Sequence, residues 1–190
     1  VWEYDAIAME TVLITGASGF VGKALTRALR ARGYDVVKLV RHPPSEPDEI
    51  QWAPGEFVAW PDGKHLDYAV HLAGQAVFGL WTPERKKAIR ESRVVGTQTI
   101  AEFVASRAQK PKVLISASAI GIYGDCGDEE LTESSAPGSG FLAEVAIQVD
   151  CLALGGEPTG ERSAGLAGTD DDGVEAFHAR LQTMRKAPAT

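Results

Sequence analysis

The chain has 190 residues, a formal net charge of −7 and 44% hydrophobic residues, which is ordinary globular usage. This acidic balance argues against nucleic acid as the main partner, because binding to phosphates needs a basic surface. No apolar run approaches the roughly 18–20 residues of a membrane span. Two cysteines, Cys126 and Cys151, are too few for a disulfide framework. We therefore expect a soluble, cytoplasmic protein with no membrane partner.

The N-terminal part alternates between strand and helix patterns. Residues 1–8 precede Met9, where we place the natural start, and we treat them as an N-terminal extension. The apolar run 11–15 predicts a buried parallel strand, and residues 35–40 predict a second one. Between them a helix begins at Phe20 and ends at Gly33, with a predicted apolar stripe of Val21, Leu25, Ala28 and Leu29. This order is a βαβ unit.

The alternation continues with short strands at 50–52, 68–72 and 112–116 and a helix from Thr82 to about Arg107. It predicts an α/β fold, a doubly wound parallel sheet covered on both faces. Residues 146–190 show no further strand pattern, so we expect the sheet to be truncated after about five strands. The predicted domain covers residues 9–145, and residues 146–190 are expected to form a divergent, disordered tail.

Three glycines lie between the first predicted strand and its helix. Gly16 allows a tight turn, Gly19 lets the backbone approach a pyrophosphate, and Gly22 lets the helix pack closely on the sheet. The helix N-terminus would present free N–H groups to the phosphates. The strand and helix on either side make this a specific signal for dinucleotide binding.

Arg41, at the end of the second predicted strand, points to the cofactor. An acidic residue there would bind the ribose of NAD, whereas an arginine accommodates the 2′-phosphate of NADP. No carboxylate lies between Val36 and Pro44. The sequence therefore favours NADP(H), although Arg41 as a solvated surface residue stays an alternative.

Arg93 interrupts an apolar stripe on the helix after Thr82. The stripe comprises Ile89, Gly96, Ile100, Phe103 and Val104. A charge on a buried face is costly unless it is paired. Arg93 therefore forms an internal salt bridge or extends its stem to solvent, or its guanidinium reaches the pyrophosphate or nicotinamide ribose of a cofactor.

Seven segments together resemble the atypical short-chain dehydrogenase/reductases, and most closely the group called epimerase family proteins or NADP-dependent oxidoreductases. They are TGASGFVG (15–22), LVR (39–41), HLAG (71–74), LWTPERKK (80–87), ESRVVGT (91–97), KVLISASAIGIYGD (112–125) and GFLAEV (140–145). The resemblance implies a Rossmann fold that binds NADP(H) through Gly16, Ser18, Gly19, Phe20, Val21, Gly22, Arg41, Leu72, Ala73, Gly74 and Arg93. It also implies that Ser116 and Ser118 face the nicotinamide.

The chain departs from this family at the proton-transfer pair. Extended members use a Tyr-x-x-x-Lys motif, and the matching positions here hold Phe141 and Val145, which carry no transferable proton and no charge. Ser118 and Tyr123 remain as weak candidates for a catalytic role, which the sequence does not otherwise assign. The histidines show no metal-ligand spacing, so we expect no metal site.

Three functional hypotheses follow. The first is an NADP-dependent oxidoreductase or nucleotide-sugar epimerase-like enzyme that acts on a small-molecule substrate. The second is a non-catalytic NADP(H)-binding module that senses redox state. The third is an inactive truncated or frameshifted fragment, for which we expect weak cofactor binding at best and no turnover.

Overall fold

A computed structural model describes residues 9–153 of the chain. The chain divides into two compact units, Val1–Ser118 and Ala119–Thr190. None of the helices within residues 9–153 is long and apolar enough to cross a membrane.

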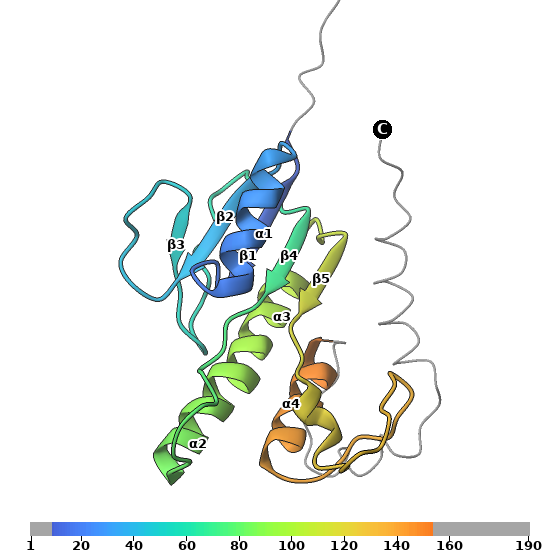
Figure 1. Ribbon diagram of the computed structural model, residues 1–190. Helices are drawn as coiled ribbons and strands as arrows, with labels where there is room; N and C mark the ends of the chain where they lie inside the picture. Colours follow the sequence, from blue (N-terminus) through green and yellow to red (C-terminus); the bar gives the residue numbers. More distant parts are fainter. Residues whose placement is uncertain (1–8, 154–190) are drawn as a thin grey trace, which may run out of the picture. The chain divides into compact units, whose positions relative to one another are not determined.

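The first unit contains a five-stranded, wholly parallel sheet (Figure 1). Its strands are β1 (Thr11–Thr15), β2 (Asp35–Val40), β3 (Glu49–Gln51), β4 (Tyr68–His71) and β5 (Val113–Ser116). The spatial order is β3-β2-β1-β4-β5, so the chain crosses from one side of β1 to the other between β3 and β4. This confirms the predicted α/β, Rossmann-like fold.

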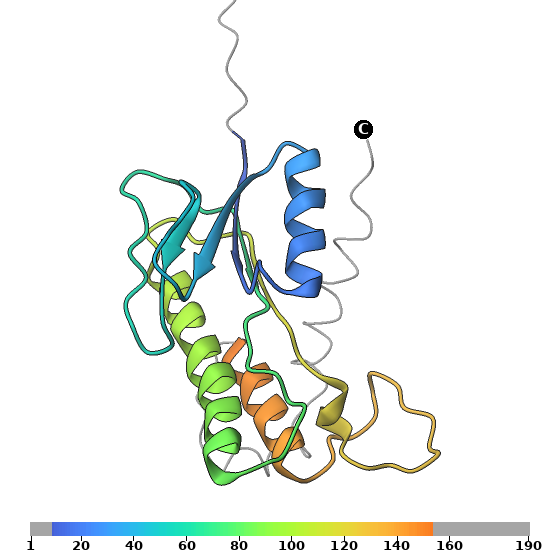
Figure 2. The same cartoon turned by 60° about the vertical axis from the view of Figure 1, so that its left-hand side comes forward.

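Both faces of the sheet are buried, as the apolar strands predict. On one face, Leu13 and Val37 join a core with Ile100 and Phe103 of the long helical segment. On the other face, Val12, Ile14 and Val36 form a second core, against which Leu25 and Leu29 of helix α1 (Phe20–Ala31) pack. Figure 2 shows α1 and the long helical segment on opposite sides of the strands. The doubly wound arrangement is therefore present in this unit.

The stripe predicted for α1 is partly wrong. Val21 is 60% exposed, and the positions turned toward the sheet are Gly22, Leu25, Thr26 and Leu29. The phase of the helix is set by Gly22, because only a residue without a side chain fits against the glycine turn. Val21 precedes this contact by one position, which carries it about 100° around the helix axis.

The helix predicted from Thr82 to Arg107 is continuous but contains a π-helical turn. It consists of α2 (Pro83–Arg90), η1 (Glu91–Val95, the π turn) and α3 (Gly96–Ser106). The Thr82 hydroxyl caps the start by accepting a hydrogen bond from the Arg85 N–H at 3.3 Å. Such π turns are rare and cluster at functional sites, and this one contains Arg93.

The second unit contains a short 3₁₀ helix, η2 (Ile120–Tyr123), and helix α4 (Phe141–Ala153). The boundary predicted at residue 145 is wrong for residues 146–153, because α4 continues through them and buries Ala146, Ile147, Val149 and Leu152. Ala146, Val149 and Leu152 keep the three-residue spacing of a helix face. The expected disordered tail otherwise concerns residues 154–190, which lie outside the described residues.

Candidate nucleotide-binding site

A cavity of about 600 Å³ lies at the carboxyl ends of β1, β2 and β4. This is where the strand order reverses, between β1 and β4, and where open α/β sheets bind ligands. The lining comes from four segments at the ends of strands and from η1: Gly16, Ala17, Ser18, Gly19, Leu39, Val40, Arg41, His42, Trp52, Pro54, Leu72, Ala73, Gly74 and Ser92. None of these residues is acidic, which favours an anionic ligand. We refer to this cavity as the crevice.

The glycine turn forms the floor of the crevice. Gly16 has φ +69°, and a Cβ atom there would lie 2.8 Å from the carbonyl carbon of Leu72. At Gly22, a Cβ atom would lie 2.2 Å from the carbonyl oxygen of Gly16, so α1 begins directly against the turn. Among the described residues, no side chain caps the α1 N-terminus, and the first turn of α1 has no acidic residue. The backbone N–H groups of this turn are therefore available to an anion.

A hydroxyl at the end of β1 joins the two walls of the crevice. The Thr15 Oγ1 atom accepts hydrogen bonds from the backbone N–H groups of Leu72 and Ala73, both at 3.1 Å. It also lies 2.7 Å from Nδ1 of His71, at the end of β4. Because two N–H donors occupy the oxygen lone pairs, the hydroxyl proton is donated to Nδ1. Thr15 thereby fixes the spacing between the glycine turn and the exit of β4.

His71 is buried behind this contact. Its ring meets Trp52 edge to face, with the centroids 6.0 Å apart, and burial lowers its pKa to about 4. The neutral ring carries its proton on Nε2, which has no hydrogen-bond partner within the described part of the chain. Neither Thr15 nor His71 was predicted to have a role in the site. The usable signal was that each is the last residue of a strand flanking the strand reversal.

Arg41 follows the last residue of β2 and is exposed on the wall of the crevice. It forms no ion pair with any residue between 9 and 153. His42 beside it donates its Nδ1 proton to the carbonyl oxygen of Pro43 at 2.9 Å. The guanidinium of Arg41 is thus free to bind a ligand.

Arg93 lies against the segment that follows β4. Its Nη1 donates to the carbonyl oxygen of Gln75 at 2.6 Å, and a Cβ atom at Gly74 would lie 3.1 Å from its Cζ. The neighbouring Ser92 hydroxyl accepts from the Gln75 N–H at 2.9 Å. Burial lowers the pKa of this half-buried guanidinium, and no carboxylate within residues 9–153 pairs with it. The internal salt bridge considered above is therefore absent from this part of the chain.

The structure brings most of the predicted cofactor residues together. Seven line the crevice, namely Gly16, Ser18, Gly19, Arg41, Leu72, Ala73 and Gly74. Gly22 packs beneath the turn, and Arg93 contacts Gly74 from the helix side. Phe20 is 96% exposed and Val21 60%. Neither residue belongs to the lining of the crevice. Their binding to a cofactor stays a prediction, and it would use their backbone N–H groups.

The two serines predicted to face the nicotinamide and the candidate proton donor Tyr123 are separated along the chain. Ser116 ends β5, pairs in register with His71 and is buried, with no hydrogen-bond partner for its hydroxyl among the described residues. Ser118 is exposed at the end of the first unit. Tyr123 belongs to the second unit, within η2. Their contact with a substrate stays a prediction.

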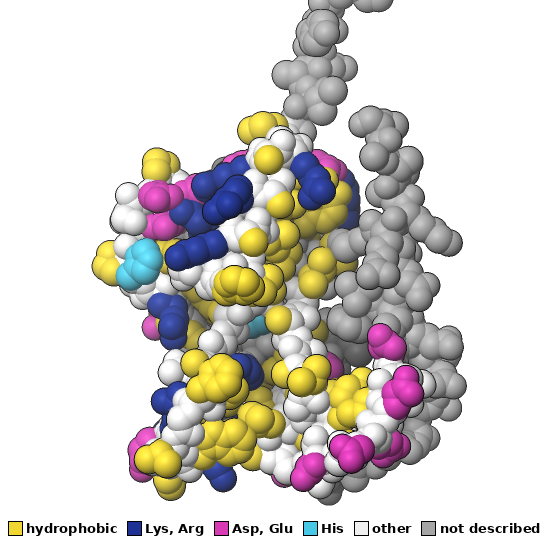
Figure 3. All heavy atoms as spheres, viewed as in Figure 1, with side chains coloured by type: hydrophobic (Ala, Val, Ile, Leu, Met, Phe, Trp, Pro, Cys, Tyr) yellow, Lys and Arg dark blue, Asp and Glu magenta, His cyan; other side chains and the backbone are white. Residues whose placement is uncertain are grey.

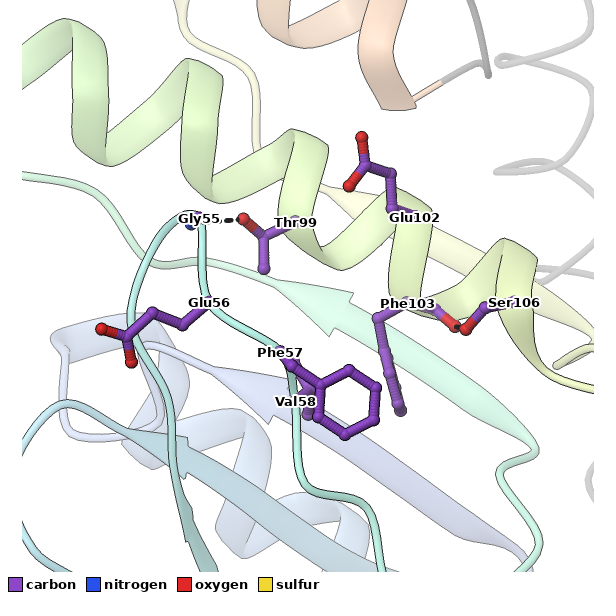
Figure 4. A pocket seen from close by; sticks show the side chains of 8 residues that line it. All are labelled: Gly55, Glu56, Phe57, Val58, Thr99, Glu102, Phe103 and Ser106. Carbon is purple, nitrogen blue, oxygen red and sulfur yellow. Dashed lines mark hydrogen bonds between the residues drawn. The ribbon is translucent and has the colours of Figure 1, made fainter.

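A smaller hollow of about 270 Å³ lies in the first unit, away from the crevice (Figure 4). It lies between the loop 55–58 and α3. These two segments are joined at one end by a hydrogen bond from the Gly55 N–H to the Thr99 hydroxyl, at 2.7 Å. Its lining includes the carboxylates of Glu56 and Glu102 but no Lys or Arg. A phosphate group would be repelled there, so the crevice is the candidate nucleotide site.

Comparison with known sequences identifies the family. The profile of the NAD dependent epimerase/dehydratase family matches residues 12–150. The chain belongs to this family. It is similar to the epimerase family protein Mb2239 of Mycobacterium bovis, with 34% identity over 161 residues, which cover 82% of this chain and 52% of the relative. The chain thus spans about half the length of the curated relatives it matches.

Solved structures agree with this assignment. A nucleoside-diphosphate sugar epimerase from Corynebacterium glutamicum is 41% identical, with a TM-score of 0.63, over 82% of this chain and 32% of its own. Human epimerase family protein SDR39U1 with NADPH is 29% identical, with a TM-score of 0.67, over 78% and 50%. MoeE5 in complex with UDP-glucuronic acid and NAD is 25% identical, with a TM-score of 0.62, over 76% and 48%. Members of this fold family therefore bind either nicotinamide cofactor.

Proposed function

We propose that the first unit binds NADP(H) in the crevice and serves as the nucleotide-binding part of an NADP-dependent oxidoreductase or epimerase-like enzyme. The observation that carries the proposal is Arg41. It is an exposed guanidinium at the end of β2 that forms no ion pair within residues 9–153, and it lies on the wall of a cavity whose described lining holds no carboxylate. In this fold the ribose of the cofactor lies near the end of β2, and an arginine there suits a 2′-phosphate.

The remaining residues of the crevice fit the rest of the cofactor. The glycine turn offers backbone N–H groups to a pyrophosphate. The turn needs glycine at position 16, because a side chain there would collide with the backbone of Leu72. Arg93 supplies a half-buried cation with no carboxylate partner among residues 9–153. When bound, the nicotinamide supplies a site for hydride transfer. A similar structure contains NADPH, which supports the choice of cofactor.

Substrate chemistry rests on similarity. One similar structure is a nucleoside-diphosphate sugar epimerase, and MoeE5 binds UDP-glucuronic acid. We therefore propose a nucleotide sugar or a related carbonyl compound as the substrate of the whole protein. Turnover of NADPH with a panel of aldehydes, ketones and nucleotide sugars tests this part. Turnover of any of them supports an enzyme.

A redox-sensing module is the second candidate. It is favoured by the start of α4, where Phe141 and Val145 occupy the positions of the missing Tyr-x-x-x-Lys pair and Val145 is buried. A buried valine cannot lower the pKa of a proton donor. Tight NADP(H) binding without turnover of any panel member would favour the sensor.

The Arg41→Ala variant tests the cofactor assignment. A charge-assisted, bidentate contact to phosphate contributes about 1.5–3 kcal/mol. Removing it should weaken NADP⁺ binding roughly tenfold to a hundredfold and leave NAD⁺ binding nearly unchanged. Calorimetric titration of both nucleotides measures this, with the exposed Arg32→Ala as a control for loss of one positive charge. Equal losses for the two nucleotides would refute the assignment.

A further inference from the structure

A second hollow opens beside the adenosine end of the crevice. It has a volume of about 480 Å³ and lies between α1 and the edge of the sheet formed by β2 and β3. Ala17, Ser18, Val40 and His42 line both this hollow and the crevice, so the two are continuous. Arg41 lies between Val40 and His42 in the chain. A group attached to a ribose at the end of β2 can therefore enter this second hollow, which we call the α1 hollow.

The charges around the α1 hollow do not cancel. Lys38 forms ion pairs with Glu46, Asp48 and Glu49, and Arg30 pairs with Asp48. These contacts occupy the carboxylates of Glu46 and Glu49, the two acidic residues that line the hollow.

Two cations in the lining remain without a carboxylate. Lys23 and Arg27 lie one turn apart on α1, and neither forms an ion pair within residues 9–153. Figure 3 shows Lys and Arg side chains gathered over this part of the surface. The α1 hollow is therefore positively charged although the whole chain is acidic.

One residue that lines this hollow has a buried hydroxyl. Thr26 lines it, is only 8% exposed and has no hydrogen-bond partner for its Oγ1 among the described residues. A buried polar atom without a partner is costly. Because Thr26 lies between Lys23 and Arg27 on the helix, a ligand that satisfies the hydroxyl would also meet both cations. A hydroxyl donor beside two cations suits a phosphate monoester, which carries two negative charges and several acceptor oxygens.

We propose that the α1 hollow receives the 2′-phosphate of NADP(H), and that Lys23 and Arg27 determine specificity for NADP together with Arg41. This inference rests on the proposed function, since it needs the adenosine ribose to lie at the end of β2. It assigns the discrimination to two elements, α1 and the β2 exit, rather than to Arg41 alone. The phosphate would lie between them, with Thr26 donating its hydroxyl proton from the wall.

The test uses the 190-residue chain with Lys23→Gln, Arg27→Gln and the double substitution. Arg32→Gln, at the exposed end of α1 and outside the hollow, is the matched control. Calorimetric titrations with NADP⁺, NAD⁺ and inorganic phosphate give the affinities. A partly exposed ionic contact contributes up to about 1 kcal/mol, or roughly a fivefold change in affinity. Each single variant should weaken NADP⁺ about fivefold and the double variant about twentyfold, while NAD⁺ changes less than about twofold.

Three other outcomes overturn the inference. The first is an unchanged NADP⁺ affinity in the double variant. The second is an equal loss for NAD⁺ and NADP⁺, or the same loss in Arg32→Gln. The third is a chain that binds NADP⁺ and NAD⁺ with equal affinity and also binds inorganic phosphate, with the phosphate binding lost in the double variant. This result would mark a site for free phosphate. If the unaltered chain binds neither nucleotide, the proposed function fails along with this inference. If NADP⁺ preference depends on Arg41 alone, only this inference fails.

Discussion

Replacing Thr15 by valine should separate the walls of the crevice without changing the volume of the core. Thr15 is fully buried, and valine has almost the same shape. The substitution removes the hydrogen bonds that Oγ1 accepts from the Leu72 and Ala73 N–H groups and the one that it donates to His71 Nδ1. The Leu72 N–H keeps a second acceptor, the Thr15 carbonyl oxygen at 3.3 Å. Three hydrogen bonds are thus lost, and two groups, the Ala73 N–H and the buried His71 ring, lose the partner that Thr15 supplied.

The magnitude follows from these contacts. A typical hydrogen bond contributes about 1 kcal/mol, and a buried group left unpaired costs about 1–3 kcal/mol. Thr15→Val should therefore lower the free energy of unfolding by about 3 kcal/mol. Thr15→Ser keeps the hydroxyl and loses one methyl group, which costs about 1 kcal/mol. The expected order of stability is threonine, serine, valine.

Urea denaturation at pH 7 measures these free energies, and nucleotide titration gives a second readout. Because Thr15 positions a wall common to both cofactors, the valine variant should weaken NADP⁺ and NAD⁺ equally, unlike Arg41→Ala. The serine variant should retain the affinity of the parent. A valine variant as stable as the serine variant would refute the role assigned to the hydroxyl.

Three further predictions concern neighbouring residues. The pKa of His71 is lowered to about 4 in the folded chain, so as the pH falls below 6.5 the unfolded chain binds a proton that the folded chain does not. This should remove about 2.5 kcal/mol of stability by pH 4.5, and urea titrations should show that loss abolished in His71→Asn; an equal loss in both proteins would contradict it. Gly22→Ala should destabilise the chain by about 3 kcal/mol in thermal unfolding, and Gly19→Ala far less. The reason is that the added Cβ atoms would lie 2.2 and 3.2 Å, respectively, from the Gly16 carbonyl oxygen. Equal effects would be evidence against close packing at the turn. Arg93→Met keeps the stem and removes the charge, so it should weaken NADP⁺ about tenfold in calorimetry at little cost in stability; a large loss of stability with unchanged affinity would mean that Arg93 is structural.

The sheet was predictable because its signals are local. The apolar runs at 11–15 and 35–40 are buried on both faces, which leaves no polar alternation to misread. Gly16 and Gly22 were identified from spacing alone, and the structure explains the spacing through the contacts with Leu72 and with the Gly16 carbonyl oxygen. Such backbone constraints exclude every other residue type, so they appear directly in the sequence.

The residues that were missed act through contacts between distant segments. Thr15 and His71 are 56 positions apart and meet only because β1 and β4 are paired in parallel. Lys38 pairs with three carboxylates because of the register of β2 and β3, and this leaves Lys23 and Arg27 without an ion pair among residues 9–153. No spacing rule within one segment reports such pairing.

The end of the ordered pattern was placed too early for a different reason. Residues 141–153 contain few charged residues, so they lack the polar face that marks a surface helix. The structure buries residues along most of α4, from Ala143 to Leu152. Because apolar residues occur on all sides of this segment, the sequence shows no clear helical period, and the helix was not predicted beyond residue 145.

A titration of the ¹⁵N-labelled chain with NADP⁺, followed by amide chemical shifts, tests the central claim most directly. The account predicts that the largest changes fall on residues 16–19, 41–42 and 72–74, which line the crevice. It predicts smaller changes on 55–58 and 99–106, which line the acidic hollow beside α3. Shifts concentrated on that second set, or no saturable shifts at all, would contradict nucleotide binding in the crevice.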